Sequence, residues 1–240
     1  MKNFLGVIGG MGPLATADFL SKLVNHTAAS TDQENIPVIV YGDCTTPDRT
    51  KNIIGDGPSP YPQLLQAVKF LNDAGVGSIC MPCNSAHHWH SELIKHSAAP
   101  IFSIIKASAD QVHKKNPGIK TVGVLSTYGT YQVGIYNQAL QELGFNVVLP
   151  TLEEFDALIS PGIAFIKANE LAEAEIVFEK ASDLLVSRGA EIVILGCTEI
   201  PIGMQQQYAQ QPAKFVDSTE ALAISVTEFY SKSASINDPR

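Results

Sequence analysis

Positive charge is scarce in this chain of 240 residues. Lysine and arginine together number 16 against 24 aspartates and glutamates, so the formal net charge is −8 at pH 7. A general nucleic-acid surface needs clustered basic side chains that neutralise phosphates. We therefore expect no nucleic-acid partner. A small anionic ligand remains compatible with this charge, because a few local basic residues decide whether one is bound.

Long hydrophobic runs are also absent. No apolar segment approaches the ~20 residues of a membrane-spanning helix. The first apolar run, residues 4–8, is shorter than the core of a signal peptide, and no small-residue cleavage pattern follows it. We therefore expect no membrane partner and a cytoplasmic location.

Cysteine is sparse, with four residues at positions 44, 80, 83 and 197. Thiols in the cytoplasm are mostly reduced. Cys80 and Cys83 form a Cys-x-x-Cys pair, but no second half of a zinc site accompanies it. The sequence therefore favours free thiols.

Short β-branched runs alternate with longer helical stretches, a pattern typical of an α/β fold with parallel sheets. The hydrophobic fraction of 45% and the charged fraction of 17% fit a globular protein. The pattern predicts strands at residues 4–8, 37–41, 78–81, 100–102, 121–125, 146–148, 191–195 and 214–216. It predicts helices at residues 13–29, 60–74, 85–96, 104–115, 134–143, 171–187 and 219–231.

The two halves of the chain correspond. Gly75 and Cys83 in the first half match Gly189 and Cys197, each 114 residues further on. We therefore expect two pseudo-symmetric α/β domains, each with a mostly parallel sheet flanked by helices: residues 1–103 with 217–240, and residues 104–216. Ligands of parallel sheets bind beyond the carboxyl ends of the strands. The active site is therefore expected in the cleft between the domains.

Cys83 and Cys197 each follow a predicted strand and precede a predicted helix. A helix start lowers the pKa of a nearby thiol. Good capping residues follow both thiols, namely Asn84 or Ser85, and Thr198. A lone free cysteine is usually a small buried apolar residue, but the shared surroundings favour a paired role. Two facing thiols can remove and return a proton on opposite faces of one carbon.

The segment Gly-Gly-Met-Gly-Pro at residues 9–13 follows the first predicted strand. Pro13 suits the first position of a helix, and glycines allow a ligand carboxylate to approach backbone N–H groups at a helix start. A nucleotide loop is the rival interpretation. The spacing matches neither Gly-x-Gly-x-x-Gly nor the phosphate-binding Gly-Lys-Ser/Thr, so the carboxylate interpretation is favoured.

Two cations are candidates for carboxylate binding. Arg49 lies in a polar loop after the second predicted strand, and its forked guanidinium matches a carboxylate. Lys167 is the second candidate. Both residues could instead have no ligand: Arg49 could be a solvated loop arginine, and Lys167 could be a lysine on the surface of a helix.

Histidines crowd the segment after Cys83. Cys83, His87 and His90 have a spacing at which a zinc site is conceivable, but no histidine lies near Cys197, and Pro201 occupies the position equivalent to His87. His87 could instead polarise the region around Cys83. Glu199 could orient a substrate ammonium, form a local hydrogen bond, or be an ordinary acid at a helix start.

Five motifs occur in a set order: Gly-Gly-Met-Gly-Pro, Thr-Pro-Asp-Arg, Met-Pro-Cys-Asn-Ser-Ala-His, an Ile-Lys segment and Leu-Gly-Cys-Thr-Glu-Ile-Pro. Together they resemble the aspartate/glutamate racemase superfamily, and within it the aspartate racemase branch. The resemblance runs from residue 6 to about residue 231. The glutamate racemase branch usually opens with Asp-Ser-Gly, which this chain lacks.

The resemblance implies a racemase that needs no pyridoxal phosphate (PLP), other cofactor or metal and that commonly forms a homodimer. It implies that Cys83 and Cys197 are the two bases, acting on an acidic amino acid: aspartate, with glutamate as a further candidate. It assigns the substrate lining to Met11, Gly12 and Pro13, and the carboxylates to Arg49 and Lys167. It assigns the α-carboxylate or ammonium to Asn84, Ser85, Thr127, Thr198 and Glu199.

Two alternatives stay open. Superfamily relatives also carry out maleate-type isomerisation or decarboxylation, and some of them replace one cysteine by threonine. This chain keeps both cysteines, which favours reversible racemisation. A non-catalytic binding protein for an acidic metabolite is the other alternative.

Overall fold

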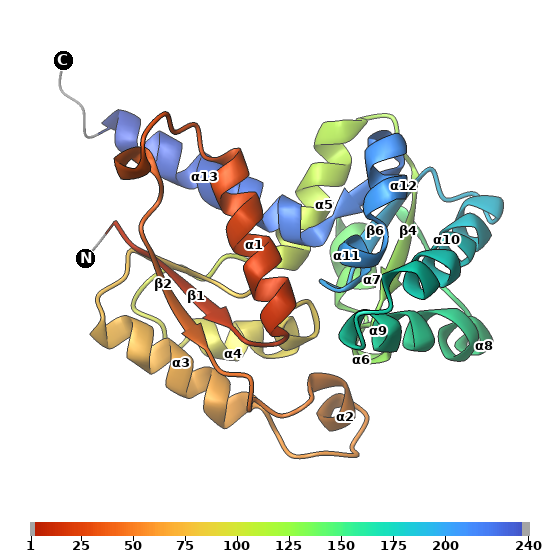
Figure 1. The fold of residues 1–240 in the computed structure, drawn as a ribbon, viewed down its shortest axis with the longest axis horizontal. Helices are drawn as coiled ribbons and strands as arrows, with labels where there is room; N and C mark the ends of the chain where they lie inside the picture. The colour runs from red at the N-terminus through yellow and green to blue at the C-terminus, as the bar shows by residue number, and fades with distance from the viewer. Residues whose placement is uncertain (1–2, 237–240) are drawn as a thin grey trace.

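The computed structural model describes residues 3–236, with side chains as far as residue 232. It contains two parallel β-sheets, each flanked by helices (Figure 1). The first sheet has the order β2-β1-β3, and the second has the order β5-β4-β6-β7. The predicted α/β fold with two parallel-sheet halves is confirmed.

The first sheet is built around β1 (Leu5–Gly9), which pairs with β2 (Val38–Gly42) and β3 (Ser78–Cys80). All five residues of β1 are buried, as expected for a parallel strand covered on both faces. The second sheet repeats this order, with β4 (Thr121–Ser126) between β5 (Asn146–Val148) and β6 (Ile192–Gly196). The strand β7 (Phe215–Asp217) pairs with the outer edge of β6.

The repeat extends to the turns that lead into β3 and β6. Gly75 has φ of 68° and Gly189 has φ of 95°, a left-handed conformation that favours glycine. Gly75 follows α3 (Tyr61–Asp73) and Gly189 follows α10 (Leu171–Ser187). Each glycine therefore turns the chain from a helix into the strand that leads to a cysteine.

The expected strand at residues 100–102 is wrong. Ile101 forms only an isolated parallel bridge to Ile79. The chain leaves the sheet directly afterwards, because Ser103 caps α5 (Ile104–Lys115) by accepting a hydrogen bond from the Lys106 N–H.

The helix expected at residues 85–96 is divided. A 3₁₀ segment, η2 (Ser85–Trp89), precedes the short helix α4 (His90–Ile94). The long helix α10 and helix α5 have the predicted bounds. The remaining helices are α1 (Pro13–His26), α2 (Arg49–Ile53), α6 (Tyr128–Val133), α7 (Ile135–Glu142), α8 (Leu152–Glu154), α9 (Ser160–Lys167), α11 (Ile200–Gly203), α12 (Gln205–Gln210) and α13 (Ser218–Ile236).

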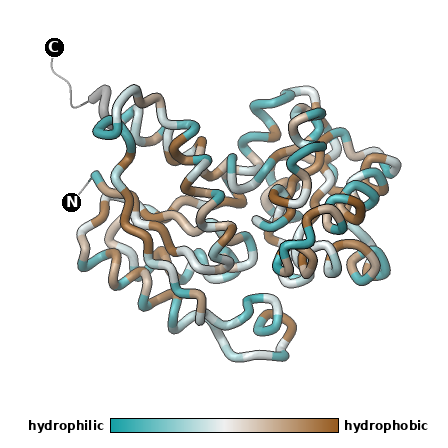
Figure 2. The backbone as a smooth tube through the Cα atoms, viewed as in Figure 1, coloured by the Kyte–Doolittle hydropathy of each residue, from teal (hydrophilic) through white to brown (hydrophobic). Residues whose placement is uncertain are grey.

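Helix α13 connects the two halves, because it packs on α1 beside the first sheet and on α5 beside the second. One hydrophobic cluster contains residues of both sheets, among them Leu5 and Val7 from β1 and Ile192 and Ile194 from β6. Figure 2 shows hydrophobic residues along the central strands and alternating polar and apolar turns on outer helices such as α3. No helix within residues 3–236 combines the length and apolar character that a bilayer crossing requires.

Candidate active site

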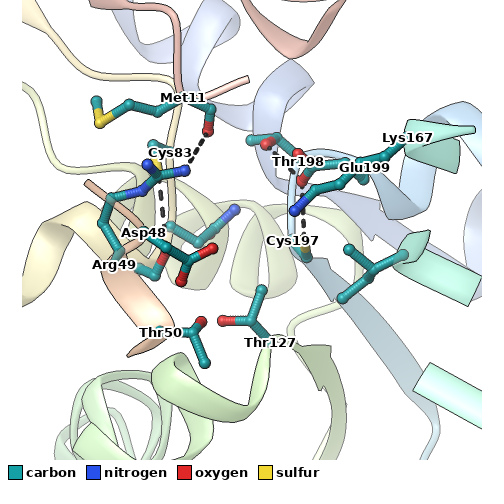
Figure 3. Close-up of a pocket in the computed structure, with 13 residues that line it drawn as sticks. Met11, Asp48, Arg49, Thr50, Cys83, Thr127, Lys167, Cys197, Thr198 and Glu199 are labelled. Atoms are coloured by element: carbon teal, nitrogen blue, oxygen red, sulfur yellow. Dashed lines mark hydrogen bonds between the residues drawn. The ribbon is translucent and has the colours of Figure 1, made fainter. Parts of the chain in front are cut away.

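One pocket is lined by residues from both halves of the chain, at the carboxyl ends of the strands. It encloses about 380 Å³ of empty space, part of it open to solvent. The lining residues are Met11, Asp48, Arg49, Thr50, Cys83, Asn84, Ser85, Thr127, Ile163, Lys167, Cys197, Thr198 and Glu199 (Figure 3).

Most of the predicted site residues share this pocket, but two do not. Gly12 and Pro13 are outside the lining, and Pro13 is exposed at the start of α1. Asp48, Thr50 and Ile163 line the pocket although the sequence did not single them out. Ile163 precedes Lys167 by one helical turn on α9, so the i, i+4 relationship could have identified it.

The loop after β1 is closed by its own hydrogen bonds. The Gly10 N–H donates to Thr16 Oγ1 over 2.9 Å, and the Thr16 hydroxyl donates to the Gly12 carbonyl over 3.0 Å. The Gly10 N–H is therefore not available to a ligand. The loop instead directs the Met11 carbonyl toward Arg49 Nη2, 3.4 Å away.

Cys83 lies just beyond β3 and is 3% exposed. Its Sγ atom is 3.7 Å from Ser85 Oγ, and its N–H donates to the Met81 carbonyl over 2.8 Å. The expected cap of the following helix by Asn84 is wrong. The Asn84 side chain makes no capping bond, because it accepts from the Tyr136 hydroxyl and donates to Ser218 Oγ instead.

Cys197 follows β6 directly and is also 3% exposed. Its thiol donates to Glu199 Oε2 over 3.0 Å, and the Thr198 hydroxyl lies 3.2 Å from the same oxygen. Burial, reinforced by the Glu199 carboxylate, raises the pKa of the Cys197 thiol well above its usual value. The expected lowering of the pKa by a helix start is therefore wrong for Cys197. The following helix α11 has only four residues and Thr198 does not cap it.

Arg49 is the first residue of α2 rather than part of a loop, because Asp48 caps that helix by accepting from the Lys51 N–H. Its Nη1 donates to the carbonyls of Thr46 and Pro47, at 3.1 and 3.0 Å. Its buried Nε has no hydrogen-bond partner among the described residues. The guanidinium is thus held in place by three backbone carbonyls while its Nε–H stays unpaired.

Lys167 is the last residue of α9 and reaches the pocket from the other half of the chain. Figure 3 shows Arg49 and Lys167 on opposite sides of the pocket. Lys167 forms no ion pair with a residue in the described part of the chain. Two cations without carboxylate partners therefore line one pocket.

His87 is neutral and structural in character. Its Nδ1 donates to the Cys83 carbonyl over 2.8 Å, and its Nε2 accepts from the Ile104 N–H over 3.0 Å. Burial lowers its pKa to about 3. The imidazole thereby joins the backbone of Cys83 to the start of α5.

The short helices α2 and α6 contact each other beside the pocket. Thr127 caps α6 by accepting from the Thr130 N–H over 3.2 Å. A Cβ atom on Gly129 would lie 2.8 Å from Thr50 Oγ1, so the two short helices approach closely. Arg49 and Thr127 are consequently placed on facing elements.

Comparison with known proteins gives one family and several close folds. The family model "Asp/Glu/Hydantoin racemase" matches residues 8–226. The broad-specificity amino-acid racemase RacX of Bacillus subtilis is 28% identical, over 94% of this chain and 97% of its own length. The aspartate racemase structure from Picrophilus torridus is 30% identical, with a TM-score of 0.83 over 95% of this chain and 94% of the other. An aspartate racemase homologue from Pyrococcus horikoshii is 26% identical, with a TM-score of 0.75 over 95% and 99%.

Proposed function

The chain belongs to the Asp/Glu/hydantoin racemase family, and on that premise we propose that it interconverts L- and D-aspartate, with glutamate as a second substrate, without a cofactor. The observation that carries the proposal is the placement of two thiols, Cys83 and Cys197, in one pocket with two unpaired cations. The similarity to the Picrophilus torridus aspartate racemase supports aspartate as the substrate.

The proposed reaction is a proton transfer across one carbon. A thiolate removes the α-proton from one face, and the electron pair of the broken C–H bond remains on the carbanion. The thiol on the opposite face then donates its proton, so the configuration inverts and the second sulfur is left as the thiolate. Because the Cys197 thiol donates to Glu199 and has a raised pKa, we assign Cys197 as the proton donor for the enantiomer whose α-proton faces Cys83. The two roles are exchanged for the other enantiomer.

The α-carbon of an amino acid is a weak acid, so the pocket must stabilise the carbanion. General acid–base transfer alone contributes ~10²–10⁴-fold. Positive groups aimed at the carboxylates supply further stabilisation in a site that excludes water. We assign this role to the guanidinium of Arg49 and to Lys167.

The side chain of Asn84 is already engaged within the protein, so we assign its contribution to the backbone. The N–H groups of Asn84 and Thr198 have no acceptor among the described residues. They are therefore free to bind the α-carboxylate. Ser85, Thr127 and Glu199 complete the proposed contacts to the carboxylate and the ammonium group. A homodimer, as the family resemblance implies, is part of the same proposal.

Incubation with L-aspartate in the absence of added PLP and metal tests the proposal. Chiral chromatography should detect D-aspartate, rising until the two enantiomers are equal. L-glutamate should give the same result, whereas L-alanine, which lacks a side-chain carboxylate, should react poorly. Absence of D-isomer from both acids would reject the proposal. Release of carbon dioxide, isomerisation of maleate, or binding without α-proton exchange would each identify one of the alternatives.

A further inference from the structure

A buried cluster of polar side chains joins the loops that carry the two thiols. It consists of Asn84, Tyr136 and Ser218, which are at most 2% exposed. Asn84 follows Cys83 in the first half of the chain. Tyr136 lies on α7 beside the second sheet, and Ser218 is the first residue of α13. The cluster therefore spans the interface between the two halves.

The hydrogen bonds of this cluster form a continuous chain. The Tyr136 hydroxyl donates to Asn84 Oδ1 over 2.6 Å, since an amide oxygen can only accept. Asn84 Nδ2 donates to Ser218 Oγ over 3.1 Å, and the Ser218 hydroxyl donates to the Leu195 carbonyl over 2.8 Å. Leu195 lies in β6, two residues before Cys197.

We propose that Tyr136 and Ser218 are positioning residues that fix the separation and orientation of the Cys83 and Cys197 thiols through Asn84 and the Leu195 carbonyl. Asn84, the residue after Cys83, is hydrogen-bonded to Ser218, and Ser218 is hydrogen-bonded to the Leu195 carbonyl. Leu195 is two residues before Cys197, so the cluster connects the backbone segments of the two thiols. Ser108 Oγ, whose hydroxyl donates to the Ile104 carbonyl, lies 3.2 Å from the Tyr136 hydroxyl. The proposal rests on the two-thiol reaction proposed above.

The chemistry distinguishes positioning from general stability. Inversion needs both sulfur atoms aligned on opposite faces of one carbon. Exchange of the α-proton with retention needs only the sulfur that removed it, because that thiol can return a solvent-derived proton to the same face. A misplacement of about 1 Å can cost ~10²-fold in rate. Loss of the cluster should therefore reduce inversion more than it reduces exchange with retention.

The test compares Tyr136→Phe and Ser218→Ala with the control Tyr131→Phe. Tyr131 lies on α6, and its hydroxyl has no hydrogen-bond partner within the described residues. Each variant is incubated with L- and D-aspartate in D₂O, and early deuterium incorporation is measured separately in inverted and retained molecules. In Tyr136→Phe and Ser218→Ala, the ratio of retained to inverted deuterated product should rise about tenfold or more. An unchanged ratio in both variants would overturn the proposal, and Tyr131→Phe should match the wild type.

A second readout does not depend on activity. Alkylation by iodoacetamide is followed by peptide mass spectrometry, with the exposed Cys44 as an internal reference. Both pocket thiols are 3% exposed, so their alkylation should be slow in the wild type and at least several-fold faster in Tyr136→Phe and Ser218→Ala, at an unchanged rate for Cys44. If Cys83 and Cys197 are alkylated at the same rates in all variants, the proposal that the cluster positions the two thiols is rejected. If the wild type shows no racemisation, this readout still decides the positioning role while the proposed function fails separately.

Discussion

The thiol of Cys197 donates a hydrogen bond to Glu199 Oε2 over 3.0 Å. Among the described residues, no carboxylate accepts a hydrogen bond from the Cys83 thiol. Its side-chain hydrogen-bond partner is Ser85 Oγ, at 3.7 Å. The two thiols are thus equivalent in their position after a strand but unequal in their electrostatic surroundings. The negative charge of Glu199 favours the thiol form of Cys197 over the thiolate.

Replacement of Glu199 by glutamine should move the pH dependence of racemisation. The reaction needs one thiol and one thiolate, so activity falls at high pH when the second thiol ionises. Burial and Glu199 raise the pKa of Cys197, and removal of the carboxylate lowers it. The basic limb of the kcat/KM profile should therefore shift to lower pH in Glu199→Gln, equally for both enantiomers. Glu153→Gln, at an exposed position on α8, is the control. If the basic limb of the profile stays at the same pH in Glu199→Gln, the proposed effect of Glu199 on the pKa of Cys197 is contradicted.

Replacement of Arg49 by lysine should weaken substrate binding. An ammonium cannot reproduce the three backbone contacts of the guanidinium and its unused Nε donor together. A charge-assisted hydrogen bond contributes about 1.5–3 kcal/mol, so KM for aspartate should rise roughly 10- to 100-fold. Steady-state kinetics measure the change. Arg188→Lys is the control, because Arg188 pairs with Glu154 outside the pocket; an unchanged KM in Arg49→Lys would remove Arg49 from the binding site.

His87 should make the protein less stable in acid. Its folded-state pKa of about 3 lies below the ordinary value of 6.5, so the unfolded chain binds the extra proton between these pH values. The contribution of neutral His87 to the free energy of unfolding is fully present above pH 6.5 and is lost as the pH falls toward 3. The slope from this group is at most about 1.4 kcal/mol per pH unit. In His87→Gln, urea unfolding at several pH values should give a shallower dependence. His96→Gln, at an exposed position, is the control; an unchanged slope in His87→Gln would contradict the assignment.

The repeated strand, cysteine and glycine pattern predicted the fold well, because short buried runs and glycine turns carry strong local signals. Helices α5 and α10 have the predicted bounds, since their apolar residues recur over three or more turns. The short helices α2 and α6 were not predicted. Five or six residues are too few to show a helical period in the sequence. The two helices contact each other in the folded protein, and this contact joins residues far apart in the chain.

Most of the residues that line the pocket were predictable, but their interactions were not. Ten of the predicted residues line one pocket, since the carboxyl ends of parallel strands converge. The hydrogen bonds from Asn84 to Tyr136 and Ser218, in place of a helix cap, could not be predicted, because those partners lie 52 and 134 residues away along the chain. The raised pKa of Cys197 depends in the same way on burial and on the rotamer of Glu199.

The most direct test of the account is the stereochemistry of α-proton exchange in Cys83→Ser and Cys197→Ser. Each variant is incubated in D₂O with L-aspartate and, separately, with D-aspartate, and deuterium at the α-carbon is measured by mass spectrometry after chiral separation. Cys44→Ser, at an exposed thiol outside the pocket, is the control and should racemise like the wild type. The account predicts that both pocket variants lose racemisation, and that the one-sided exchange that remains falls on opposite enantiomers in the two. Near-normal racemisation in either variant, or exchange of the same enantiomer in both, would contradict it.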